Sequence, residues 1–246
     1  MRCARTSGFS LIELLAVIVV VSVLLAIALP ALSAVRLRGY ELKSLANLSQ
    51  IGHVSEMYSA EHGTFIFGTS GPTRAQGFGN EGWVSFPVWR LETNWPLLVH
   101  GVAPWSDHVA VWISPRGDDS QMMELIHSNA IQSIVPVSYR YSNSFIASPR
   151  VWDPEQQGLV SDNEVRAIRP SAVRFPSSKV IFYDSDRSYI RGDPDSTDIR
   201  PVLFVDGSAR MAMDIDATDG TQNLLDLKRS PRIYHDTPHG VYGQDF

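Results

Sequence analysis

One charged residue lies inside an otherwise apolar run, where a carboxylate could take part in charge pairing. The run from Phe9 to Leu29 has 21 residues, and Glu13 is the only charged one. A carboxylate inside a membrane segment costs roughly 2.5–3.5 kcal/mol on insertion scales, so it indicates a function and a partner of opposite charge. The alternative is that Glu13 lies near the start of a helix and simply reaches the lipid headgroups.

Acidic residues also gather in the C-terminal half, where they could bind calcium. Five aspartates lie close together, at Asp184, Asp186, Asp193, Asp195 and Asp198. Calcium prefers several oxygen ligands on a flexible loop, but the invariant glycine and terminal glutamate of an EF-hand are lacking. We interpret the segment as a solvated acidic loop, with a calcium site at Asp184, Asp186, Asp193 and Asp195 as the alternative.

Other residues that could bind a metal or take part in catalysis do not lie in a recognised sequence motif. His235 and His239 are four residues apart, but Pro238 disfavours the helix that would align them on zinc. The sequence has no nucleophile elbow, zinc-protease helix motif, phosphate loop or Cys-x-x-Cys pair. The six tryptophans could form a sugar- or partner-binding surface, but packing in the core is the better explanation. We expect no catalytic site, no metal site and no cofactor.

The element that must position Glu13 is the apolar run itself. As a helix the run is about 31 Å long, enough to cross a bilayer core. A cleaved secretory signal is an alternative, but the usual apolar region of such signals is only roughly 7–15 residues. The best small-x-small site, in ALPALSA around Pro30, does not end the run cleanly. Basic residues flank the run on both sides, so charge bias does not decide its orientation.

Charge and cysteine content exclude several classes of protein. The formal net charge of −5 argues against a general electrostatic grip on nucleic acid, so we expect no nucleic-acid partner. Cys3, in the short basic segment before the apolar run, is the only cysteine. If that segment is removed, the mature chain has no thiol for a disulfide or a cysteine metal site.

The segment GFSLIELL, from Gly8 to Leu15, resembles the processing site of type IV prepilins and type II secretion pseudopilins. In that family a short basic leader ends in glycine and is followed by phenylalanine, an apolar helix and a glutamate five residues into the mature chain. The resemblance implies cleavage between Gly8 and Phe9 by a prepilin peptidase, and N-methylation of Phe9. It also implies that Glu13 pairs with the N-terminal ammonium of a neighbouring subunit in a filament core.

The resemblance continues beyond the apolar run. Pro30 lies where pilin helices often bend, because proline removes a helical hydrogen bond and kinks the helix. Apolar residues then recur on one helical face, at Leu37, Leu45, Leu48, Ile51 and Tyr58. His62-Gly63 is a plausible helix end, and Tyr58–Phe65 is similar to the end of this helix in pseudopilins. We predict an amphipathic helix over about 31–62.

The remainder of the chain is rich in strand-like runs. They lie at Trp83–Leu91, His108–Ser114, Val137–Phe145, Lys179–Tyr183, Val202–Val205 and Ser208–Met213. Asp206-Gly207 predicts a hairpin with a type I′ turn between the last two. This hairpin is similar to the terminal hairpin of a prepilin-like subgroup, although Ser196 replaces the histidine found ten residues before its Asp-Gly, and Ser114 replaces its cysteine. The segment 230–246 has no periodicity, and we expect a loop or a frayed end.

These elements predict an α+β fold, in which a long N-terminal helix packs on an antiparallel sheet, as in pilins. The expected organisation is a cleaved leader over 1–8, a transmembrane helix over 9–30 and an extracytoplasmic pilin-like domain over 31–246. The protein would then be a single-pass inner-membrane protein that is assembled into a periplasmic or cell-surface filament.

The resemblance implies a structural subunit, pilin or pseudopilin, of a type II secretion pseudopilus or a type IV pilus, and the large loops favour a minor subunit. Its partners would be other pilin subunits, the prepilin peptidase that cleaves and methylates, and an inner-membrane assembly platform. The alternative is a signal-anchored extracytoplasmic binding or hydrolytic domain unrelated to filaments.

Substituting the residue before the expected cut tests this interpretation. Gly8→Ala should leave an uncleaved precursor in the membrane, because the peptidase reads the small residue before Phe9. Immunoblotting of membrane fractions and mass spectrometry of the N-terminus would measure the outcome. Normal processing of the variant would contradict the resemblance to prepilins.

Overall fold

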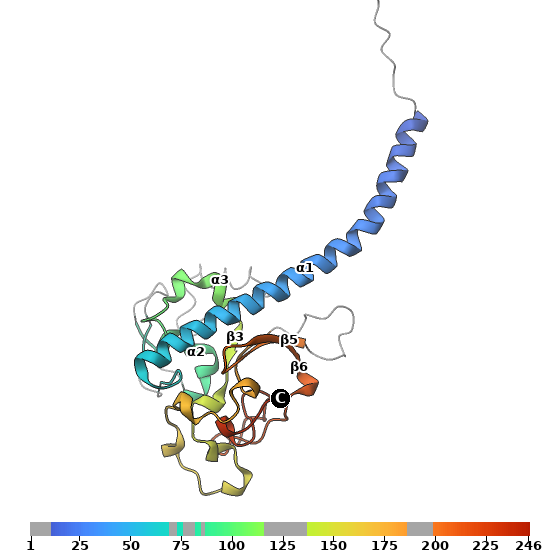
Figure 1. The fold of residues 1–246 in the computed structure, drawn as a ribbon. Helices are drawn as coiled ribbons and strands as arrows, with labels where there is room; N and C mark the ends of the chain where they lie inside the picture. The colour runs from blue at the N-terminus through green and yellow to red at the C-terminus, as the bar shows by residue number, and fades with distance from the viewer. Residues whose placement is uncertain (1–10, 69–72, 76–81, 85–86, 116–136, 186–198) are drawn as a thin grey trace, which may run out of the picture. The chain divides into compact units, whose positions relative to one another are not determined.

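The computed structural model describes residues 11–68, 73–75, 82–84, 87–115, 137–185 and 199–246. Gly8 and Phe9, on either side of the expected cleavage site, and Ser196 lie outside these ranges. The chain divides into two compact units, Met1–Tyr40 and Glu41–Phe246. Helix α1 (Leu11–His62) contributes to both units (Figure 1). We call the second unit the head.

The part of α1 in the head is amphipathic, as predicted. Leu48, Ile51 and Tyr58 are buried, and Leu45 is half-buried. The helix ends at His62, and the next residue, Gly63, has a φ of +72°. The backbone N–H of Gly63 donates to the carbonyl of Ser59 at 2.8 Å. Glycine adopts this left-handed conformation without steric cost, so the predicted end of the helix is confirmed.

The head is built on a four-stranded antiparallel sheet. Its strands are β3 (Tyr139–Tyr141), β4 (Val180–Asp184), β5 (Ile199–Phe204) and β6 (Ala209–Met213), neighbours in that order. A separate pair consists of β1 (Thr73–Ala75) and β2 (Gly82–Val84). A long N-terminal helix with an antiparallel sheet is the predicted α+β fold, which is therefore confirmed (Figure 1).

Helix α1 covers one face of this sheet. Leu48 and Ile51 belong to the same buried cluster as Phe182 of β4 and Leu203 of β5. The backbone of α1 comes close to the sheet at Gly52, where a Cβ atom would lie 3.2 Å from a methyl carbon of Leu203. A side chain at this position would require Leu203 or the helix to shift by a few tenths of an ångström.

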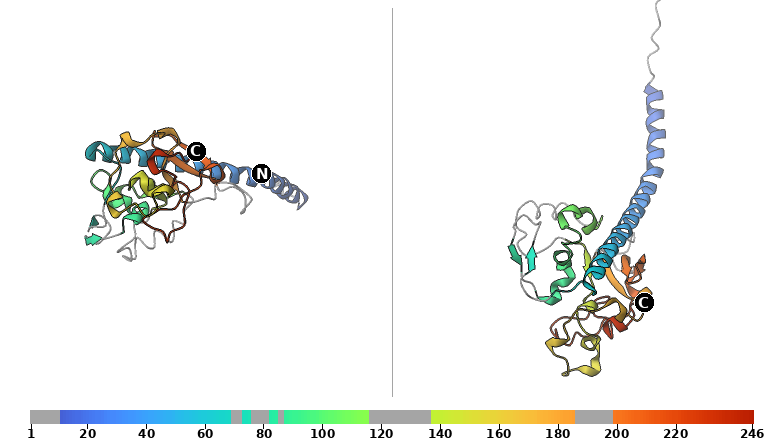
Figure 2. Two further views of the ribbon diagram at one scale, coloured as in Figure 1. Left: turned by 90° about the horizontal axis from the view of Figure 1, so that it is seen from below. Right: turned by 60° about the vertical axis from the view of Figure 1, so that its left-hand side comes forward.

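The C-terminal segment covers the opposite face. Tyr234 and Phe246 pack in a second cluster with Val180 of β4 and with Val202 and Phe204 of β5. The expectation of a frayed end over 230–246 is therefore wrong. The segment has almost no regular structure, as its lack of periodicity indicated. It is nevertheless held in place, because its aromatic side chains pack on a face of the sheet. Figure 2 gives two further views of the ribbon.

Three of the predicted strand runs are partly helical, which corrects the prediction. Residues 88–91 lie in a 3-10 turn (Val88–Arg90) and at the start of α2 (Leu91–Leu98), and most of 108–114 is taken by α3 (Val109–Trp112). In the third run only Tyr139–Tyr141 is a strand, and Asn143–Phe145 is a 3-10 turn. Short apolar runs do not distinguish a buried strand from a buried helical turn, because both faces are apolar in each case.

The terminal hairpin is confirmed, but its turn type is not. Gly207 has a φ of +84°, and its N–H donates to the carbonyl of Phe204 at 3.0 Å. Asp206 is not among the described residues with positive φ, whereas a type I′ turn needs two such residues. The Asp206 carboxylate instead accepts the backbone N–H of Ser208 at 2.9 Å. These bonds match a three-residue loop with glycine in the left-handed position.

The head should fold without the apolar segment. Removing Met1–Leu29 deletes exposed apolar residues and leaves the amphipathic part of α1 with the sheet and the C-terminal segment. We expect a soluble, folded fragment with a cooperative unfolding transition, measured by gel filtration and circular dichroism without detergent. An aggregated or unfolded fragment would show that residues 1–29 are part of the core.

Candidate assembly site

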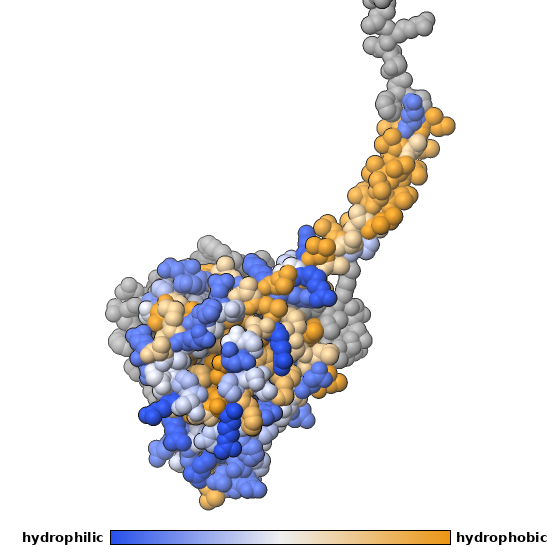
Figure 3. All heavy atoms as spheres, in the orientation of Figure 1, coloured by the Kyte–Doolittle hydropathy of each residue, from blue (hydrophilic) through white to orange (hydrophobic). Residues whose placement is uncertain are grey.

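The first part of α1 exposes apolar side chains on all sides. Leu11, Val20 and Leu29 keep 85%, 57% and 62% of their surface exposed, and Figure 3 shows apolar side chains along this part of the helix. The helix is long and apolar enough to cross a membrane. A helix that is apolar all round is stable in a bilayer or against other apolar helices, so this segment fits a single-pass membrane anchor.

The hydroxyl groups along this surface bond within the helix itself. Ser22 Oγ donates to the carbonyl of Ile18 at 2.7 Å, and Ser33 Oγ donates to the carbonyl of Pro30 at 2.8 Å. Such internal bonds remove the cost of bringing a hydroxyl into an apolar environment. The helix continues through Pro30. Pro30 has no N–H for the carbonyl of Ala26, and the bend expected there stays a prediction.

Glu13 is the charged group of this surface. It lies in the first turn of α1, and no other charged residue occurs between Leu11 and Val35. Negative charge near a helix N-terminus is favoured by the helix dipole. The side chain is exposed. If apolar helices cover this surface, a carboxylate buried among them needs an opposite charge, because an uncompensated buried charge is strongly destabilising.

Comparison with known families adds the deciding observation. Residues 3–29 match the prokaryotic N-terminal methylation motif. The N-terminal segment is prepilin-like. The matched segment contains Arg5, Glu13 and the whole apolar run from Phe9 to Leu29. The motif implies processing by prepilin peptidase and assembly with other pilins. Neither the curated proteins nor the solved structures include a significant match to the chain.

In the head, a buried polar cluster joins α1 to the sheet. Ser44 Oγ donates to Asp184 Oδ2 at 2.8 Å and lies 3.0 Å from the hydroxyl of Tyr139. Asn47 Nδ2 donates to the same hydroxyl at 3.2 Å. Ser114 Oγ donates to Asp184 Oδ2 at 2.7 Å. All five side chains are buried, so each hydrogen bond lowers the cost of burying a polar group and fixes the register of α1.

This cluster corrects the interpretation of Asp184. The sequence placed Asp184 on a solvated acidic loop and among the calcium candidates, but Asp184 belongs to β4 and is fully buried. Two hydroxyl groups already donate to one of its oxygens. The other candidates, Asp186, Asp193 and Asp195, lie outside the described residues. Within the described part of the chain, no group of three or more His, Cys, Asp or Glu side chains could hold a metal ion.

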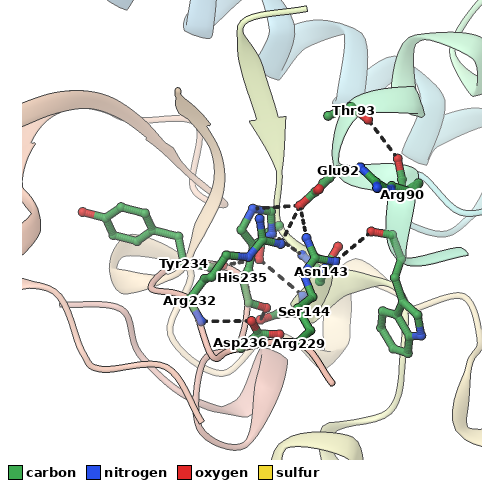
Figure 4. Close-up of polar contacts among 12 residues, drawn as sticks. Arg90, Glu92, Thr93, Asn143, Ser144, Arg229, Arg232, Tyr234, His235 and Asp236 are labelled. Atoms are coloured by element: carbon green, nitrogen blue, oxygen red, sulfur yellow. Dashed lines mark hydrogen bonds and ion pairs between the residues drawn. The ribbon is translucent and has the colours of Figure 1, made fainter. Parts of the chain in front are cut away.

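A second buried cluster surrounds Glu92 of α2 (Figure 4). Glu92 Oε2 lies 2.7 Å from Arg229 Nη2, 2.5 Å from Arg232 Nη2 and 3.4 Å from His235 Nε2. Arg229 Nη1 also donates to the carbonyl of Trp89 at 3.1 Å. Because Glu92 belongs to α2 and Arg229, Arg232 and His235 belong to the C-terminal part of the chain, this cluster attaches that part to α2.

His235 is neutral in this cluster. The backbone N–H of Asn143 donates to His235 Nδ1 at 3.3 Å. Burial, together with the positive charges of Arg232 and Arg229, lowers the pKa of His235 well below its usual value. A neutral ring that accepts at Nδ1 carries its proton on Nε2, which faces Glu92.

A third buried contact anchors the end of the C-terminal segment. Lys179 Nζ lies 3.1 Å from Asp245 Oδ2, and both side chains are buried. Asp245 Oδ2 also accepts the backbone N–H of Val180 at 2.7 Å. Burial lowers the pKa of Lys179, and the charge of Asp245 opposes this shift. The ammonium and the carboxylate satisfy each other at a site from which water is excluded.

Five of the six tryptophans pack inside the head, as the sequence favoured. Trp95, Trp105, Trp112 and Trp152 are buried, and Trp89 is half-buried. Trp95 Nε1 donates to the carbonyl of Tyr139 at 3.0 Å, which satisfies its polar atom. His235 and His239 do not form a pair of helical ligands, because His239 has a left-handed φ of +62°.

Because His235 is neutral in the folded chain, the free energy of unfolding should depend on pH. The unfolded chain takes up a proton on this residue as pH falls through about 6.5, whereas the folded chain does not until its lower pKa is reached. Stability should fall with decreasing pH in this window, by up to about 1.4 kcal/mol per pH unit from this residue. His235→Asn, which keeps an acceptor for the N–H of Asn143, should remove this part of the slope.

Urea unfolding of the full chain in non-ionic detergent, followed by tryptophan fluorescence, would measure both slopes. His53→Asn, at an exposed position of α1, is the matched control. Equal slopes for wild type and His235→Asn would show that His235 does not titrate differently in the two states.

Proposed function

We propose that this chain is a structural subunit, pilin or pseudopilin, of a type IV pilus or a type II secretion pseudopilus. The methylation motif over residues 3–29 carries the proposal. The exposed apolar surface of α1 supports it, because many copies of such a helix can bury their surfaces against one another. The large irregular part of the head favours a minor subunit over the main repeating one.

The proposal assigns a role to each residue of the N-terminal segment. Prepilin peptidase cleaves after Gly8 and methylates the new N-terminus of Phe9. The apolar part of α1 first holds the subunit in the inner membrane and then enters the filament core. Glu13 pairs there with the ammonium of Phe9 on an adjacent subunit. The head stays outside the membrane, and the subunit acts by assembly rather than by catalysis.

The rival function, a signal-anchored binding or hydrolytic domain, leaves the N-terminus unmodified. Mass spectrometry of the mature protein distinguishes the two, because N-methylated Phe9 fits only a processed prepilin. Deleting the gene then separates the filament types. Loss of sheared surface filaments assigns a pilus, and loss of secreted enzymes with normal surface filaments assigns a pseudopilus.

Glu13→Gln tests the assembly role directly. The amide keeps the shape of the side chain and loses its charge, so the ammonium of Phe9 would enter the core unpaired. Breaking one partner of a buried pair typically costs about 3–5 kcal/mol, and we expect filament incorporation to fall at least about tenfold. Insertion and cleavage at Gly8 should be normal. Blotting of sheared filaments against membrane fractions measures the ratio.

Glu61→Gln, an equal charge removal at the exposed end of the same helix, is the matched control and should assemble normally. Wild-type incorporation of Glu13→Gln would show that Glu13 has no charge partner in the filament. Loss of incorporation by both variants would point to a general effect of charge.

A further inference from the structure

A pocket lies in the head beside the Glu92 cluster. Its volume is about 600 Å³, within the range of about 300–1,000 Å³ found for small-molecule sites. Its lining comes from the start of α2, from strands β3, β4 and β5, and from the C-terminal segment. The charged side chains of the lining are Arg90, Arg140, Arg200, Arg232, Glu92 and Asp214.

The positive charges of this pocket outnumber the negative ones. Arg200 is paired with Asp214, to which its Nε donates at 2.8 Å. Arg232 is paired with Glu92. In the part of the chain that the structure describes, the guanidinium groups of Arg90 and Arg140 make no hydrogen bond or ion pair. Two positive charges in the pocket are therefore without a counter-charge from the described protein.

Further donors of the lining are unused. Arg232 Nε is buried and has no hydrogen-bond partner among the described atoms. The hydroxyl of Tyr183 is a further donor, and burial raises the pKa of Tyr183 to about 12. A ligand that accepts several hydrogen bonds would satisfy these groups.

The surroundings extend the positive region. A neighbouring depression of about 610 Å³ shares Arg90, Glu92 and Arg232 with this pocket and adds Lys228 and Arg229. This concentration of cations occurs on a protein whose formal net charge is −5. Cations gathered in a hollow of an acidic protein attract anions to that one place.

We propose that this pocket binds a dianionic oxyanion, a phosphate group, carried on a small organic molecule. Planar guanidinium groups bind such oxyanions through paired hydrogen bonds. A phosphate monoester carries a charge of about −1.5 to −2 at neutral pH, which balances Arg90 and Arg140, whereas a carboxylate balances only one of them. The volume leaves room for the group that bears the oxyanion.

Calorimetric titration of the full chain in non-ionic detergent tests this site. The probes are glucose 6-phosphate, glucose 6-sulfate, glucuronate and inorganic phosphate, each at the same ionic strength. We expect glucose 6-phosphate to bind at least about fivefold more tightly than glucose 6-sulfate and glucuronate, because it matches two positive charges and each of the others carries only one negative charge. Inorganic phosphate that binds as tightly as glucose 6-phosphate would assign the free ion as the ligand and overturn the part of the proposal that concerns the organic group. Glucose 6-sulfate or glucuronate binding as tightly as glucose 6-phosphate, or no binding by any probe, would overturn the proposal.

Variants place the binding at the pocket. Arg140→Gln and Arg90→Gln should each weaken binding of glucose 6-phosphate about tenfold, since each removes one charge-assisted contact. Arg169→Gln removes an exposed arginine elsewhere on the head and should not change the affinity. Thermal unfolding without ligand reports whether each variant is folded. Equal affinities for folded Arg140→Gln, Arg90→Gln and wild type would overturn the assignment.

Discussion

The head depends on the burial of one carboxylate, that of Asp184. Two hydroxyl groups donate to it, one from Ser44 on α1 and one from Ser114 in the segment after α3. Arg200 of β5 donates to its backbone carbonyl at 3.3 Å. One residue of β4 therefore fixes the helix, a neighbouring segment and the next strand of the sheet. Because a buried charge without donors is strongly destabilising, any rearrangement of these elements must keep its partners.

The two parts of helix α1 are suited to different environments. Its first part is apolar on every side, which suits a membrane or a filament core. Its last part has one buried face, on which Ser44 and Asn47 are mixed with Leu48 and Ile51. The polar residues specify where the helix sits on the sheet, since only one position satisfies them, whereas the apolar residues supply most of the favourable free energy.

Much of this architecture could be predicted from the sequence. The end of α1 at His62 and strands β4, β5 and β6 follow from periodicity, β-rich runs and Asp206-Gly207. Helices α2 and α3 could not be predicted, because runs such as 108–114 are short and apolar in either conformation. The prediction of a frayed C-terminal segment was wrong for another reason. Its side chains are held by long-range contacts, such as Lys179 with Asp245, which leave no local periodic pattern.

Some of the candidate sites could likewise be predicted from the sequence, and others could not. The N-terminal motif has a fixed local spacing, so Glu13 could be found from the sequence alone. The clusters around Asp184 and Glu92 join residues far apart in the chain, and nothing near Glu92 in the sequence indicates Arg229 or Arg232. Ser114 was noticed only as a replacement for cysteine, while its hydroxyl is a donor that the buried carboxylate uses.

The packing of α1 and the C-terminal segment on opposite faces of the sheet has a mechanical consequence. A load on a filament would reach the head through α1, and the contacts of Leu48, Ile51 and Gly52 with the sheet would bear it first. Because these contacts lie side by side along the helix, sliding α1 would have to break many of them together rather than one after another. The aromatic contacts of Tyr234 and Phe246 lie behind the sheet, outside that line of force. Under tension the helix–sheet interface would thus carry the load as a unit, while the C-terminal cover would carry little of it.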